Sequence, residues 1–81
     1  METRVAIIAV IVEDSQQIDV LNKTLHEYSK YIIGRMGIPY PKKGINIISV
    51  AVDASADEIG ALSGKLGMIK GISVKTVYSK V

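Results

Sequence analysis

Apolar residues gather in four short stretches that have the length and composition of β-strands. Nearly every position of Arg4–Val12 is apolar, which is typical of a strand buried on both faces. Residues 31–38 and 45–53 predict two more strands, and the turn between them contains two prolines and Gly44. Ile72–Tyr78 predicts the fourth strand. The second and third strands should therefore form a hairpin.

Two segments repeat an apolar residue every three or four positions, which predicts amphipathic helices. The first helix covers residues 15–28, and Asp14 is placed to cap its N-terminus. The second begins after Ser55, which has the capping-box spacing with Glu58. The apolar stripes consist of Ile18, Leu21, Leu25 and Tyr28 in the first helix and of Ile59, Leu62, Leu66 and Ile69 in the second.

The predicted order of elements is β-α-β-β-α-β, within a single domain that covers residues 1–81. Crossover connections between parallel strands are right-handed, so two such units around a hairpin give a ferredoxin-like α+β sandwich. This fold has a four-stranded antiparallel sheet of order 4-1-3-2 and carries both helices on one face. The other face of the sheet should then meet water and be polar.

The first and third strands contradict that expectation, because both carry aliphatic side chains on their two faces. A large exposed apolar patch on a soluble chain usually marks an interaction site. We therefore expect a homo-oligomer, a dimer or tetramer, although a small domain can also tolerate a partly exposed face. The pattern does not tell which face the helices cover. The candidate interface residues are Ile7, Ile11, Tyr40, Ile48 and Val50.

Composition excludes several classes of function. There is no cysteine, which removes disulfides and thiolate metal sites. The net charge of +2 is dispersed, and the first and third strands lack the aromatic residues on which RNA-binding sheets stack bases. The apolar run near the N-terminus is too short to span a membrane and lacks a signal-peptide cleavage site, so we expect a cytoplasmic protein.

No group of residues has the pattern of a catalytic site. Glu13 and Asp14 follow the first strand, where acylphosphatase-like enzymes hold a phosphate, and these carboxylates would repel one. His26 is the only histidine, and its position at the border of the first helical stripe suits a half-exposed residue better than a metal or proton site. We therefore expect no enzymatic activity and no cofactor.

Three residues are candidates for ligand binding. Arg35 interrupts an apolar strand, and it must either pair with an acid or bind an anion. Gly60 and Gly64, with Gly67, form a stripe of small residues along the second helix. Such a stripe either allows close packing within the chain or leaves a smooth surface for a ligand or a partner's backbone.

The segments GRMGIPY, at residues 34–40, and IGALSGKLG, at residues 59–67, resemble those of iron-only hydrogenase system regulators, and the likeness covers nearly the whole chain. The resemblance implies an ACT-like fold, similar to the C-terminal sensing domain of nickel-responsive repressors but without a DNA-binding arm. Nickel-sensing domains bind metal through several histidines and a cysteine, so His26 alone does not fit that role. ACT domains that bind amino acids usually have glycine in the turn that here contains Glu13 and Asp14.

The resemblance and the apolar sheet together predict an oligomeric regulatory domain, with a small ligand near Arg35 and the glycine stripe at a subunit interface. The main alternative is a structural or adaptor subunit that docks another protein through its aliphatic sheet face. A small enzyme of the same topology is the third hypothesis. No direct contact with nucleic acid or membrane is expected.

Overall fold

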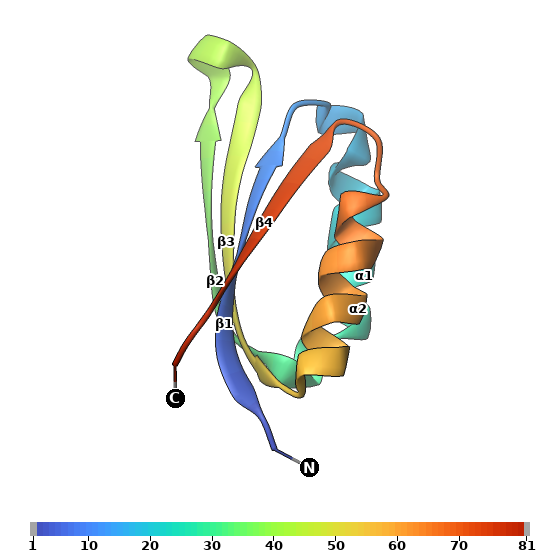
Figure 1. The fold of residues 1–81 in the computed structure, drawn as a ribbon. Coiled ribbons are helices and arrows are strands. Elements are labelled where there is room, and N and C mark those ends of the chain that lie inside the picture. Colours follow the sequence, from blue (N-terminus) through green and yellow to red (C-terminus); the bar gives the residue numbers. More distant parts are fainter. Residues whose placement is uncertain (1, 81) are drawn as a thin grey trace.

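The computed structural model describes residues 2–80, which form one four-stranded sheet and two helices (Figure 1). Three short 3-10 turns lie in the connections, at Ser15–Gln17, Ser29–Tyr31 and Pro41–Lys43. The main elements are β1 (Arg4–Val12), α1 (Ile18–Glu27), β2 (Ile32–Tyr40), β3 (Ile45–Ala54), α2 (Ala56–Gly67) and β4 (Ile72–Tyr78).

The sheet has the order β2-β3-β1-β4, and all neighbouring strands are antiparallel. This is the predicted 4-1-3-2 arrangement, and the ferredoxin-like α+β fold is confirmed. Both helices lie on the same side of the sheet, and no element within residues 2–80 covers the opposite side (Figure 1). We call that opposite side the open face.

Side-chain alternation in β1 shows which sheet face the helices cover. Ala6, Ile8, Val10 and Val12 are buried, whereas Val5, Ile7 and Ala9, which alternate with them, are exposed. Alternate residues of a strand point to opposite faces, so the buried set faces the helices. The core contains the side chains of both predicted helical stripes together with the covered side of the sheet: Ala6, Ile8, Val10, Val12, Leu21, Leu25, Tyr28, Ile48, Val50, Val52, Ala54, Ile59, Leu62, Leu66 and Ile72.

Side-chain caps start both helical segments as the sequence predicts. The Asp14 carboxylate accepts a hydrogen bond of 3.0 Å from the backbone N–H of Gln16. This first segment begins as a 3-10 turn and becomes α-helical only at Ile18. The Ser55 hydroxyl accepts from the backbone N–H of Glu58 at 3.2 Å, which satisfies one of the free donors at the start of α2.

The hairpin differs from the prediction at its tip. The sequence assigns Pro39 and Tyr40 to the turn, but the structure includes both in β2. β2 is an edge strand of the sheet, so the missing N–H of Pro39 does not have to break a ladder. Gly44 closes the turn with a φ of 65°, a left-handed conformation that glycine adopts without strain. A register shift between Ile32 and Gly34 marks a bulge in β2.

Gly71 ties the end of α2 to the loop after β1. Its φ is 79°, and its carbonyl accepts a hydrogen bond of 2.7 Å from the Glu13 N–H. A Cβ at this position would lie 2.8 Å from the Cβ of Asp14, which is closer than packed carbons allow. The contact requires glycine both for its backbone conformation and for its lack of a side chain.

Candidate functional site

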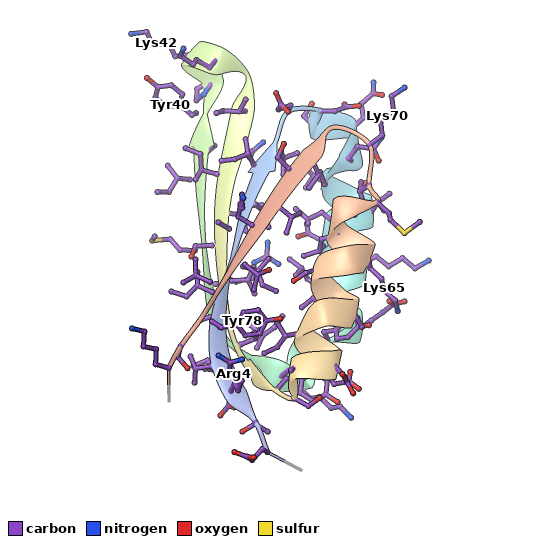
Figure 2. All side chains as sticks on the ribbon, in the orientation of Figure 1. Arg4, Tyr40, Lys42, Lys65, Lys70 and Tyr78 are labelled. Carbon is purple, nitrogen blue, oxygen red and sulfur yellow. The ribbon has the colours of Figure 1, made fainter. Side chains whose placement is uncertain are left out.

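The open face is an apolar surface that spans all four strands. Residues paired across antiparallel strands project from the same face, and the pairing aligns Ile38 with Ile47 and Ile47 with Ile11. A second row runs from Ala51 through Ile7 to Val77. Figure 2 shows side chains projecting from this face with no other element over them. The large exposed apolar residues of the open face are Val5, Ile7, Met36, Ile38, Tyr40, Ile47 and Val77.

The accessible surface area of the chain is larger than expected for a compact folded monomer of its mass. The accessible surface is 5435 Å² for a chain of 8.7 kDa. The usual scaling of surface with mass gives about 4,700 Å² for a folded monomeric protein. The excess of about 700 Å² is close to the area of about 800 Å² that each partner contributes to a standard protein–protein interface. The excess belongs to the chain as a whole, and the open face, which no element within residues 2–80 covers, contributes to it.

The structure separates the five predicted interface residues into two groups. Ile7, Ile11 and Tyr40 lie on the open face, and Tyr40 stands near the hairpin tip (Figure 2). Ile48 and Val50 pair with core residues of β1, and they are only 5% and 0% exposed under the helices. These two side chains therefore belong to the chain's own core and not to the open face.

Arg35 lies on the helix side of β2, opposite to the open face. It pairs in register with Val50, whose side chain points to the helices. Its Nη2 donates a hydrogen bond of 3.0 Å to the side-chain oxygen of Asn22 on α1. The acid partner that the sequence suggested is not found, since no carboxylate within residues 2–80 forms an ion pair with Arg35. Arg35 helps to line a hollow of about 270 Å³, together with Asn22, Leu25, His26, Ser29 and Ile32.

Gly60, Gly64 and Gly67 lie on the exposed side of α2. Apart from neighbouring residues and the backbone of α2 itself, no atom of the described chain lies within 4 Å of the place where a Cβ would sit on any of them. Close packing within the chain therefore does not explain the stripe. The remaining explanation is that the glycines leave a smooth surface for a ligand or a partner's backbone. The three glycines do not line the hollow beside Arg35, so the structure does not bring the predicted ligand-binding residues together.

Replacing Gly64 with alanine should stabilise the chain. The substitution meets open space and removes the entropy cost of an exposed helical glycine, so we expect the free energy of unfolding to rise by about 0.5–1 kcal/mol. Urea denaturation followed by circular dichroism measures the change. Gly71→Ala is the opposite control, because its positive φ and its contact with Asp14 should make the same substitution destabilising.

Lys65 on α2 lies beside both an acidic and an aromatic side chain. Lys65 lies 4.0 Å from a carboxylate oxygen of Glu27, and its ammonium is 5.1 Å from the centre of the Tyr28 ring. The hydrogen bond with Tyr28 raises the pKa of Lys65, whereas a lysine nucleophile needs a lowered pKa. Among residues 2–80, no three His, Cys, Asp or Glu side chains gather in a way that could hold a metal ion. None of the described helices is long and apolar enough to cross a membrane.

Comparison with solved structures places the fold among known proteins. The structure of protein TM1266 from Thermotoga maritima superposes with a TM-score of 0.93 at 39% identity, and the match covers 98% of this chain and 100% of that one. A protein from Galdieria sulphuraria matches with a TM-score of 0.73 at 16% identity, over 99% of this chain and 47% of that one, which shows the fold alone. No curated protein sequence matches the chain.

The arrangement of strands and helices defines a ferredoxin-like α+β domain. Residues 4–76 match the TM1266-like family, which is described as "Iron-only hydrogenase system regulator, putative". The chain belongs to this family. The resemblance noted from residues 34–40 and 59–67 is thereby confirmed.

Proposed function

We propose that the chain is a homo-oligomeric regulatory domain whose subunits associate through the open face of the sheet. The family's description suggests a regulator of the iron-only hydrogenase system, and that role is the one proposed here. The observation that carries the proposal is the apolar open face, on a chain whose total accessible surface exceeds that of a compact monomer of its mass by about 700 Å². An apolar face that is exposed to water favours the binding of a partner that covers it.

A second copy fits the open face better than an unrelated small ligand does. The face contains a shallow hollow of about 260 Å³, where the small residues Gly34, Ser49 and Ala51 lie between the larger Ile7 and Met36. In two-fold packing the same patch of each subunit meets its copy, so a large side chain of one subunit can fill the hollow of the other. The main charged side chains lie away from the centre, as expected for a polar rim around an apolar interface. They are Lys75 on the edge strand β4 and Asp53 near the end of β3.

Stacked subunits give a regulator a physical means of responding to a signal. A ligand or partner that binds the assembled and separate forms with different affinities shifts the population between them. The glycine stripe of α2 and the hollow beside Arg35 lie outside the open face, so both stay accessible when two sheets stack. Nothing in this mechanism requires catalysis by the chain.

Sedimentation equilibrium of the purified chain tests the proposal. We expect a mass of at least twice the 8.7 kDa of the chain at micromolar concentration, with dissociation on dilution. A monomer that persists at 100 µM would contradict self-association through this face. In that case a pull-down that recovers a stoichiometric foreign protein, lost when Ile7 is changed to lysine, would support the adaptor alternative in its place.

A further inference from the structure

The two arginines of the chain differ in how many contacts their guanidinium groups make. The guanidinium of Arg4 lies 4.7 Å above the centre of the Tyr78 ring, and it donates a hydrogen bond of 2.8 Å to the Ser79 carbonyl (Figure 2). Arg4 thus links the start of β1 to the end of β4. Arg35 forms no ring contact and no ion pair within residues 2–80, and its hydrogen bond to Asn22 uses one of five N–H donors.

The hollow beside Arg35 presents further donors and no negative charge. His26 lies one turn after Asn22 in α1, Ser29 begins the 3-10 turn that follows the helix, and all three line the hollow with Arg35. Neither the His26 ring nor the Ser29 hydroxyl has a hydrogen-bond partner within the described chain. No carboxylate lines the hollow. A cation and two free polar groups therefore face the same space.

The remaining lining is apolar, which narrows the class of ligand. Leu25 is buried at the base of the hollow, and Ile32 is half-buried beside it. A fully hydrated ion gains nothing from such a surface, whereas a small molecule with a charged end and an aliphatic body can contact both parts. A carboxylate also matches the planar fork of a guanidinium and can accept two parallel hydrogen bonds from it.

We propose that this hollow binds a small aliphatic carboxylate, with the carboxylate on Arg35 and the aliphatic part on Leu25 and Ile32. Asn22 orients the guanidinium, while His26 and Ser29 supply further hydrogen bonds. The end of α1 carries the partial negative charge of a helix C-terminus, so the attraction comes from the full charge of Arg35. The site serves the regulatory role proposed above, and because its lining belongs to a single subunit it is present in both the separate and the assembled chain.

Isobutyrate is a suitable probe because its shape combines a carboxylate with a small branched body. Backbone amide shifts in 15N-labelled protein are followed during titration at constant ionic strength. We expect saturable, millimolar binding with the largest shifts at Asn22, His26, Ser29 and Arg35. Isobutyramide has the same shape without the charge and should cause no saturable shift. Inorganic phosphate has the charge without the aliphatic part and should bind at least about tenfold more weakly.

Variants assign the binding to individual side chains. Arg35→Gln should weaken isobutyrate binding by about tenfold or more, because it removes the charge-assisted hydrogen bonds. Arg35→Lys should keep the charge but lose the two-point contact, so it should lie between the wild type and the glutamine variant. Lys42→Gln removes one positive charge at the exposed hairpin tip and is the matched control, for which no change is expected (Figure 2).

Three outcomes would overturn the inference. The first is the absence of saturable shifts in the wild-type protein, and the second is binding that Arg35→Gln leaves unchanged although circular dichroism shows the variant folded. Equal or tighter binding of phosphate would also count against it, since charge alone would then explain the site. Repeating the titration with Ile7→Lys separates this inference from the proposed assembly. A site in the hollow should still bind isobutyrate saturably in that variant, whether or not the wild type associates.

Discussion

Ile7→Lys is expected to weaken self-association of the chain by about 100-fold or more. Ile7 lies on the central strand β1 and is 47% exposed on the open face. Stacking of two such faces would bury this side chain, and a lysine there would bring an unpaired ammonium into an apolar interface. In a two-fold assembly each substitution acts twice. Sedimentation equilibrium over a range of concentrations should therefore show the wild type associated and the variant monomeric.

Val20→Lys is the matched control for this experiment. Val20 is also a β-branched residue that is 47% exposed, but it lies on α1, on the opposite side of the molecule. The same change of charge and hydropathy at this position should leave association unaltered. Both variants should keep the circular dichroism spectrum of the folded chain. If the two variants dissociate the protein alike, or if neither does, the open face is not the surface through which subunits meet.

The sequence predicted the fold well because its local signals agree with one another. β1 and β4 begin and end where the hydrophobic pattern predicts, and the caps at Asp14 and Ser55 start the helical segments. The error of two residues at Tyr40 arose because proline signals a turn in sequence, whereas an edge strand can accommodate it. The predicted strand order already puts this strand at an edge, but propensity alone does not report how far an edge strand extends through a proline.

The site was harder to predict because it depends on which face the helices cover. Strands with apolar residues on both faces fit either orientation, so sequence could not separate Ile7 from Ile8 or Ile48 from Ile47. The contact of Arg35 with Asn22 joins two elements separated by a connection whose path the pattern does not give. The one-turn spacing of Asn22 and His26 on the first helix is a usable signal, but it gains meaning only when β2 is placed beside that helix.

Arg35 and its neighbours connect the two candidate surfaces. The hollow that holds the guanidinium lies on the helix side of β2, and Arg35 also borders the shallow hollow of the open face between Gly34 and Met36. The bulge between Ile32 and Gly34 is adjacent to both. A ligand that fixes β2 at this point would act next to the surface proposed for assembly, and such differential contact is what a regulatory equilibrium requires.

Ile8→Ala is expected to cause the largest loss of stability of any single truncation discussed here. Ile8 is 0% exposed at the centre of the sheet, and it points toward the helices. Removing a buried isoleucine side chain to alanine costs about 2–5 kcal/mol, because the transfer energy is lost and a cavity remains. A chain of this length has a free energy of unfolding of about 4–12 kcal/mol. The substitution should therefore remove a large part of the stability, as measured by urea denaturation.

The control for Ile8→Ala is the same truncation at the neighbouring Ile7. Ile7→Ala truncates the same side chain one position earlier, where the structure leaves it 47% exposed. In the monomer it should cost about 1 kcal/mol, because half of the apolar area is already in contact with water. If subunits stack on the open face, the cost of Ile7→Ala grows with protein concentration, since association adds to the stability of the wild type alone. The cost of Ile8→Ala within one subunit does not depend on concentration. Equal costs for the two truncations in dilute protein would mean that the helices do not cover the face assigned to them here.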